Sequence, residues 1–244
     1  MTSFRNFLAE ELDETKLKHL EHAEDHVINA GHEGFSHAYH NLKDVHDRLT
    51  GKKNDTRITM KYDGSPSVVF GRHPETGRFF VASKSAFNKN PKINYTLEDI
   101  ERNHGHAPGL VSKLRAALQH LPKVTPKKGV FQGDIMHTAE DVHESDGRVH
   151  FTPNTITYSA PKNSAHGKAA LNSKIGVAIH TKYNGKNLED MQAEHGAQLN
   201  DFGLHKDVHL ISTEHHLDNI KFTPQNRERF AKAMTAAAAH NKKA

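Results

Sequence analysis

The chain has 244 residues, a formal net charge of +4 and no cysteine. This length suits one large domain or a domain with a small appendage, and it is long enough to bury a hydrophobic core. The lack of cysteine excludes disulfides, thiolate catalysis and cysteine-ligated zinc. The mildly basic charge permits a polyanionic partner without requiring one.

No apolar run approaches the roughly 20 residues of a membrane span, and the N-terminus lacks the apolar core of a signal peptide. We therefore expect a soluble, cytoplasmic and monomeric protein without a membrane partner. Histidine is unusually frequent, with 22 residues. The histidines are scattered and no His-Glu-x-x-His spacing occurs, so a dedicated histidine metal site is not the favoured interpretation.

Two amphipathic helices are predicted at the N-terminus, over residues 6–30 and 34–49. Apolar residues recur at helical spacing in both segments, and Gly31 and Gly51 follow as stop signals. Together these segments predict a helical hairpin packed on the main domain. The ionisable residues at 19–26 are interpreted as a solvated helix face.

The stretch from Thr59 to Gly71 is the centre of the chain. It reads TMKYDGSPSVVFG, in which a lysine, one spacer and Asp-Gly lead into a β-branched and aromatic run. The pattern predicts a strand at 58–60, a tight turn at Asp63-Gly64 and a second strand at 67–71. Lys61 would then lie at the lip of a sheet.

An amine is a nucleophile only in its neutral form, which burial or neighbouring cations favour. The sequence offers three candidate cations for Lys61, namely Arg57, Lys84 and Lys89.

Lys61-Tyr62-Asp63-Gly64 resembles motif I (Lys-x-Asp-Gly) of the covalent nucleotidyltransferases, which include ATP-dependent DNA ligases, RNA ligases and mRNA capping enzymes. In that superfamily the lysine attacks the α-phosphate of ATP or GTP and forms a lysyl-nucleotide. The resemblance implies that Lys61 is the catalytic residue and that Asp63 and Gly64 bind the nucleotide. An exposed hairpin lysine is the alternative, because four residues also match by chance.

A hairpin turn at 74–77 and a return strand at 78–83 then deliver Lys84 to the end of the sheet. Lys84 is similar to the basic residue of motif Ia, which implies a contact to the nucleotide or to phosphate. A basic loop follows, in which Lys89 and Lys92 are predicted to contact nucleic-acid phosphates. Helices are predicted after the capping residue Thr96 and over 110–121.

Residues 129–136 read as a buried strand interrupted by Gly133-Asp134. A carboxylate among apolar neighbours needs a cation or a hydrogen bond to remain there. The stretch resembles motif III of the superfamily, a strand that carries Gly-Glu with an aromatic residue nearby. The resemblance implies that Asp134 holds the divalent metal or the ribose, that Phe131 stacks on the base and that Gly133 belongs to the nucleotide site. Aspartate replaces the family's glutamate and is one methylene shorter.

Strands are predicted at 149–151, 155–159 and 174–182, with a short helix at 164–171. The last strand resembles motif IV, an acid followed by glycine and an apolar run. Gly176 and the strand match this motif, but Ile175 stands where the acid belongs. Lys174 or Lys182 resembles the motif V lysine that binds the α-phosphate.

The chain from residue 186 changes character. We predict a helix at 188–199, a strand at 208–212 and a last helix that starts at Thr223-Pro224 and ends near residue 240. This region is too short for an OB-fold and fits a small helical appendage, as in some RNA ligases. The sequence thus predicts three segments: a hairpin at 1–51, a nucleotidyltransferase core at 52–185 and an appendage at 186–244.

We expect an α+β, ligase-type nucleotidyltransferase domain with two packed antiparallel sheets flanked by helices. The resemblance implies ATP as the nucleotide, with GTP as the alternative, Mg²⁺ or Mn²⁺ as the metal, and a nucleic acid with 5′-phosphate and 3′-hydroxyl ends as the partner. Uncharacterised proteins of large tailed bacteriophages carry similar Lys-x-Asp-Gly and Gln-Gly-Asp stretches, which would place the chain in a host cytoplasm.

Two alternatives remain open. A nucleic-acid-binding protein that kept the fold without the activity would explain the missing motif IV acid. A nucleotidyltransferase could instead modify a protein or a small molecule.

Overall fold

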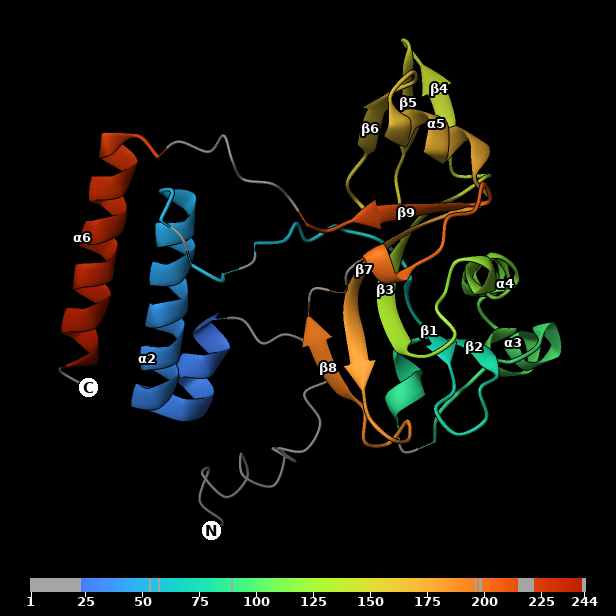
Figure 1. The fold of residues 1–244 in the computed structure, drawn as a ribbon, viewed down its shortest axis with the longest axis horizontal. Coiled ribbons are helices and arrows are strands. Elements are labelled where there is room, and N and C mark those ends of the chain that lie inside the picture. The colour runs from blue at the N-terminus through green and yellow to red at the C-terminus, as the bar shows by residue number, and fades with distance from the viewer. Residues whose placement is uncertain are drawn as a thin grey trace. The chain divides into compact units, whose positions relative to one another are not determined.

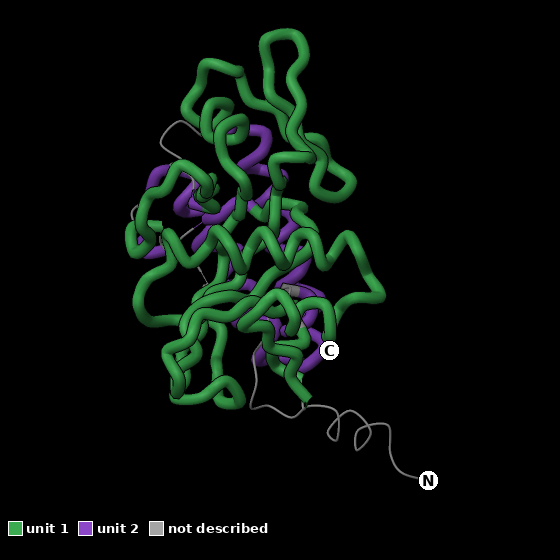
Figure 2. Tube along the Cα trace, turned by 90° about the vertical axis from the view of Figure 1, so that its right-hand side faces the viewer, with its two compact units in different colours: residues 1–18, 61–213 green, residues 19–60, 214–244 purple. Residues whose placement is uncertain are grey.

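The computed structural model describes residues 23–52, 54–56, 58–88, 90–195, 197, 199–214 and 222–242. The described residues fall into two compact units, coloured separately in Figure 2. One unit contains residues 61–213, and the other combines residues before 61 with those after 213. Within the described part of the chain, the segments on both sides of residues 61–213 therefore belong to the second unit.

The second unit is helical and is built from both ends of the described chain. Helix α2 (Ala23–Leu49) is broken at Gly31, whose backbone has φ 53° and ψ −123°. The His26 and His37 rings lie 4.9 Å apart, edge to face, on the two sides of this break. The predicted end of the first helix at Gly31 is confirmed, whereas its start at residue 6 lies outside the described residues.

Helix α6 (Pro224–Asn241) has the predicted cap, since the Thr223 side chain accepts a hydrogen bond from the Asn226 backbone N–H. His46 of α2 stacks on Phe230 of α6 with 4.4 Å between ring centroids. The two helices thus belong to one unit.

A six-stranded sheet forms the centre of the other unit (Figure 1). Five strands follow one another in antiparallel order, and β9 pairs in parallel with β7. In sheet order the strands are β2 (Phe79–Ala82), β1 (Ser67–Arg72), β3 (Val130–Thr138), β7 (Ile175–Asn184) and β8 (Gln192–His195), with β9 (Val208–Ser212) beside β7. The expected α+β class with mostly antiparallel sheets is confirmed.

A second, three-stranded sheet packs on one end of the first. It contains β4 (His143–Ser145), β5 (Arg148–Phe151) and β6 (Tyr158–Pro161), and helix α5 (Ala165–Asn172) follows. Val149 of the small sheet shares a buried apolar cluster with Met136 and Ile211 of the large sheet. This cluster joins the two sheets.

Helices α3 (Leu97–His104) and α4 (Pro108–His120) lie beside the first strands of the large sheet (Figure 1). Leu114 of α4 is fully buried in a cluster with Val68 of β1 and Ile179 of β7. Helix α3 starts with the predicted Thr96 cap, and the Asp99 side chain accepts from the Thr96 backbone N–H in return. The structure also has short 3-10 helices, namely η1 (Lys84–Phe87), η2 (Leu121–Lys123) and η3 (Leu199–Asp201).

The predicted hairpin at 58–71 is wrong in its first strand and its turn. Thr59 makes only an isolated bridge with Glu214, and residues 61–64 are irregular. The backbone N–H of Ser65 instead donates to the Ile135 carbonyl at 3.1 Å. The Ile135 N–H donates in return to the Pro66 carbonyl at 3.0 Å, so residues 65–66 continue the pairing of β1 with β3 instead of forming a hairpin with residues 58–60.

The predicted helix at 188–199 is also wrong. The structure has strand β8 at 192–195, hydrogen-bonded to residues 181–184 of β7, beyond the part of β7 that pairs with β9. Leu188 and Met191 are buried in a cluster with Tyr183. Burial of these side chains and pairing with the last residues of β7 outweigh a weak local helical pattern. Residues 186–213 consequently stay with the sheet, while α6 belongs to the unit of α2.

Candidate functional site

Three neighbouring strands carry polar side chains on one face of the large sheet. Ser67 of β1 pairs with Asp134 of β3, and Gln132 of β3 pairs with Thr181 of β7. Paired residues lie on the same face of a sheet. We call this set the polar strip, and its members are Ser67, Gln132, Asp134, His180 and Thr181.

The polar strip lies between two apolar clusters on that face. Val69 and Tyr183 belong to the cluster at one end, and Met136 and Ala178 to the cluster at the other. Gln132 is satisfied within the protein, because its amide donates to Ser67 Oγ at 2.8 Å and its carbonyl accepts from the Tyr183 hydroxyl. Burial raises the pKa of that hydroxyl to about 12, so Tyr183 stays a donor.

Residues Lys61 to Gly64, which we call the lysine motif, pack against Asp134 through Gly64. A β-carbon added at Gly64 would lie 2.5 Å from Asp134 Cβ and 2.9 Å from the Met136 sulfur, so only glycine fits this approach. Lys61 itself is exposed. Two motifs that are about 70 residues apart in the sequence are thereby brought together.

Asp63 ties the lysine motif to the loop between β5 and β6. Its carboxylate accepts from Asn154 Nδ2 at 3.0 Å, from the Thr155 hydroxyl at 2.8 Å and from the Thr155 backbone N–H at 3.4 Å. Its own backbone N–H donates to the Tyr158 hydroxyl at 2.7 Å. The Asn154 and Thr155 hydrogen bonds, with a smaller contribution from the Lys61 charge, lower the pKa of Asp63. The sequence predicted only a strand at 155–159 in this region, so the contact of Asn154 and Thr155 with Asp63 was missed.

His180 joins the polar strip through a β-bulge. Ile179 pairs with Gly133 and Thr181 with Gln132, so His180 is left without a partner in β3. Bulges redirect side chains and are frequent beside active sites. His180 Nε2 lies 3.7 Å from Asp134 Oδ1, and His180 Nδ1 lies 2.7 Å from Thr181 Oγ1. The sequence carries no signal for the bulge beyond two polar residues near the end of an apolar strand.

The predicted motif V lysines do not join the polar strip. Lys182 pairs with Phe131, which lies on the opposite face of β3 from Asp134. Lys174 is exposed and precedes β7, and its backbone N–H donates to the Asp207 carbonyl at 2.8 Å.

Phe131 and two predicted glycines have structural roles. Phe131 is 2% exposed and its ring lies 4.7 Å from that of Phe202, so it belongs to the hydrophobic core and not to a base-stacking surface. A β-carbon at Gly133 would lie 2.6 Å from the Ala178 carbonyl oxygen, and one at Gly176 would lie 2.2 Å from His137 Nε2. Close packing therefore explains both glycines.

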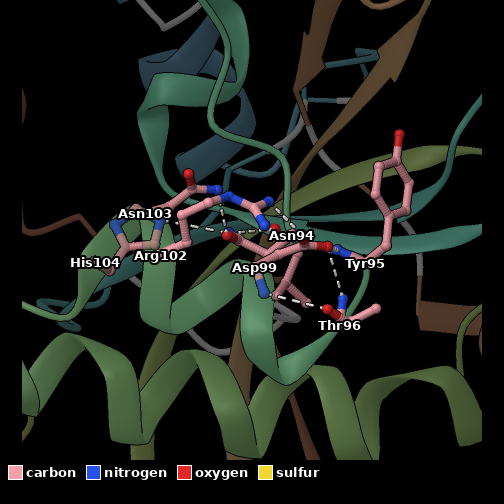
Figure 3. A network of polar contacts seen from close by, with 8 residues as sticks. Asn94, Tyr95, Thr96, Asp99, Arg102, Asn103 and His104 are labelled. Carbon is pink, nitrogen blue, oxygen red and sulfur yellow. Dashed lines mark hydrogen bonds and ion pairs between the residues drawn. The ribbon is translucent and has the colours of Figure 1, made fainter.

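A buried polar network anchors the loop after β2 (Figure 3). Asn94 is fully buried; its amide donates to the Val81 carbonyl at 2.9 Å and its carbonyl accepts from Asn103 Nδ2 at 2.9 Å. Its amide also lies 3.4 Å from Nε2 of His104. Lys92 is exposed and donates to the Asn103 carbonyl at 3.3 Å. Lys89 and the Lys84 side chain lie outside the part of the chain that the structure describes.

A chain of three histidines links β3, β9 and α5. His137 Nε2 lies 3.1 Å from His209 Nδ1, and His209 Nε2 lies 3.2 Å from His166 Nδ1. Burial lowers the pKa of His137 to about 4 and that of His209 to about 3, so both are neutral near pH 7. Within the described ranges no group of three or more histidine, aspartate or glutamate side chains is arranged to hold a metal ion.

Two cavities lie elsewhere in this unit. One of about 470 Å³ is lined by α3 and α4, including Glu101 and Arg115. The other, of about 350 Å³, lies beside β9 and includes His205 and Lys206. Neither is lined by a residue of the polar strip or of the lysine motif.

None of the helices in the described part of the chain is both long and apolar enough to cross a membrane. No curated protein and no solved structure matches the sequence significantly. A family model does match residues 16–244, almost the whole chain. The chain therefore belongs to that family, the family of unknown function DUF6267.

Proposed function

We propose that the chain is a ligase-type covalent nucleotidyltransferase in which Lys61 carries the nucleotide. The observation that supports this best is the packing of Gly64 against Asp134, which brings the lysine motif and the strand carboxylate to one site. A nucleophilic lysine beside a carboxylate that can hold a cation is the arrangement that nucleotidyl transfer requires.

In the proposed reaction the neutral Lys61 amine attacks the α-phosphorus of ATP or GTP. A nitrogen–phosphorus bond forms, the bond to the bridging oxygen of pyrophosphate breaks, and the amine loses a proton. The Asp63 hydrogen bonds hold the motif in one conformation, so that less ordering remains to be done when the nucleotide binds.

Asp134 would hold the divalent cation that the resemblance implies. Its side chain is 20% exposed, so it is not sealed from solvent. Mg²⁺ is commonly bound by one or two carboxylates together with substrate phosphates, and a single carboxylate fits that requirement. Such a cation would neutralise phosphate charge and stabilise the leaving pyrophosphate.

The proposed second step passes the nucleotide from Lys61 to a 5′-phosphate end of a nucleic acid, where a 3′-hydroxyl then displaces it. The exposed Lys92, on the loop that Asn94 anchors, is a candidate contact to the phosphate backbone.

The test is to incubate the purified protein with ATP or GTP labelled at the α-phosphate, with Mg²⁺ or Mn²⁺, and to separate it on a denaturing gel. Pretreatment with pyrophosphate removes nucleotide that was attached during expression. We expect acid-labile label on the wild type and on Lys168→Ala, a matched exposed lysine, and none on Lys61→Ala. Equal labelling of Lys61→Ala, or no label with any nucleotide and metal, would contradict the proposal.

A nucleotide- or nucleic-acid-binding protein without covalent chemistry is the second candidate. Two observations favour it. The Asp63 carboxylate is already occupied by hydrogen bonds from Asn154 and Thr155. The buried Ile175 stands where motif IV of the nucleotidyltransferases has an acid. For this candidate we expect no adduct, but saturable binding of a 5′-phosphorylated oligonucleotide in fluorescence anisotropy that weakens in Lys92→Ala.

A further inference from the structure

We propose that Asp134 and His180 together form a two-residue binding site for a divalent transition-metal ion such as Mn²⁺. The remaining positions around the ion are completed by water and by phosphate oxygens of the nucleotide. That last assignment rests on the proposed function, whereas the pair itself is argued from its own geometry.

The separation of the two side chains is that of two ligands of one ion. His180 Nε2 and Asp134 Oδ1 are 3.7 Å apart, beyond the range of a hydrogen bond. A nitrogen and an oxygen that each bind one ion at about 2.1 Å are separated by roughly 3.0–3.4 Å at ligand angles of about 90–110°, and by about 3.6 Å at about 120°. The pair thus leaves room for a cation where a direct hydrogen bond is absent.

Thr181 orients the imidazole for this task. His180 Nδ1 lies 2.7 Å from the hydroxyl oxygen of Thr181, which is only 3% exposed. When Nδ1–H donates to this hydroxyl, the lone pair is on Nε2, the nitrogen that faces Asp134. Metal-binding histidines are commonly fixed in this way by a hydrogen bond to their other nitrogen.

The backbone brings both His180 and the lysine motif close to Asp134. The bulge in β7 brings His180 to Asp134, which pairs with Ala178 in the register. Gly64 contacts Asp134 with no side chain of its own. The pair and the lysine motif therefore belong to one site.

The donor set favours particular ions. Imidazole nitrogen suits first-row transition metals, whereas Mg²⁺ prefers oxygen ligands. We therefore expect His180 to matter for Mn²⁺ and to have little effect on Mg²⁺.

The test uses the full chain with Mn²⁺ and pulsed electron paramagnetic resonance, which detects a nitrogen atom directly bound to the ion. Free Mn²⁺ is measured in the same titration by its solution spectrum. The variants are His180→Ala, Asp134→Asn, Thr181→Val and, as a matched partly buried histidine in the β1–β2 loop, His73→Ala. Circular dichroism establishes that each variant is folded.

We expect nitrogen modulation in the wild type and in His73→Ala, and its loss in His180→Ala. Mn²⁺ affinity should fall about tenfold or more in His180→Ala and Asp134→Asn, and less in Thr181→Val, which repositions the ring without removing a ligand. Nitrogen modulation that persists in His180→Ala, or that is absent from the wild type, would overturn the proposal.

The same titration separates this inference from the proposed function. Lys61→Ala removes the nucleophile but no ligand, so its nitrogen modulation should equal that of the wild type. A wild type that binds Mn²⁺ through His180 yet forms no adduct would refute the proposed function and support the metal pair. An adduct that forms equally in wild type and His180→Ala, without nitrogen modulation in either, would support the function and refute the pair.

Discussion

Gly64 sets how closely the lysine motif approaches β3. The atoms that would surround a β-carbon there belong to Asp134, Met136 and the Ile135 carbonyl, all on one strand of the sheet. Asp134 is paired with Ser67 on one side and with Ala178 on the other and cannot move aside readily, so a larger residue at position 64 must displace the motif.

We predict that Gly64→Ala destabilises the sheet unit, residues 61–213, by about 1–3 kcal/mol through overpacking. It should also lower the yield of labelled adduct, because Lys61 moves with the motif. Urea denaturation measures the first effect. Gly109→Ala is the control, since nothing lies within 4 Å of a β-carbon there and alanine favours the helix. Equal stability of Gly64→Ala and wild type would show that the motif does not rest on Asp134.

At the level of single residues, the sequence predicts roles for Lys61, Asp63 and Asp134, but it does not predict what surrounds them. The partners of Asp63 are about 90 residues away, at Asn154 and Thr155, and no local pattern links those positions. His180 was missed because its orientation depends on a bulge, which arises between two strands rather than within one.

The loop after β2 is fixed to the sheet mainly by the buried residue Asn94. Asn94 makes backbone hydrogen bonds in both directions with Val81, and its side chain reaches both Val81 and Asn103. Buried polar groups need such partners, so a change at Asn94 affects the whole loop.

We predict that Asn94→Ala costs about 1–3 kcal/mol, because it leaves the partly buried amide of Asn103 and the buried ring of His104 without this partner. Hydrogen exchange of the Val81 and Asn94 amides should accelerate relative to amides of β3 and β7. The control is Asn172→Ala, an exposed residue whose side chain donates within its own helix. If exchange at Val81 is unchanged in Asn94→Ala, the side chain does not anchor the loop.

Elements with strong local signals were predicted well. The cap at Thr96, the cap at Thr223 and the turn that ends at Gly77 each depend on residues within three or four positions. The segment 188–199 lacks such signals, and strand β8 within it forms by pairing with residues 181–184 of β7, which β9 leaves unpaired.

At the scale of the molecule, the histidine chain couples protonation to the packing of the sheet unit. His137 lies in β3, His209 in β9 and His166 in α5, so the histidine chain links the large sheet to helix α5. For His137, burial dominates the lowered pKa, and the nearby Asp141 carboxylate opposes it. For His209, burial is reinforced by His137 and His166.

We predict that stability falls as the pH drops below about 6.5. An unfolded histidine has a pKa near 6.5, while His137 and His209 have values of about 4 and about 3 in the folded state. Between these values the unfolded state binds more protons, so each histidine costs on the order of 1–2 kcal/mol between pH 7 and pH 5. Urea denaturation at a series of pH values measures the slope.

Two matched variants separate the contribution of the three-histidine chain from that of other histidines. His209→Gln should flatten the slope between pH 6.5 and pH 5, although it lowers stability at pH 7. His240→Gln, at an exposed position of α6, should leave the slope unchanged. If the free energy of unfolding changes equally with pH in wild type and His209→Gln, the three-histidine chain is not the source of the pH dependence.

The sequence by itself determined the α+β class, most strands and helices, and the two motifs around Lys61 and Asp134, because each depends on short-range spacing and side-chain type. Only the tertiary structure decided that these motifs meet at Gly64, that Asp63 is clamped by a distant loop, and that Phe131 belongs to the core. It also decided that α6 joins the unit of α2. These features depend on which strand edges and apolar faces find one another across the chain, and such long-range pairings leave no trace in a local window of residues.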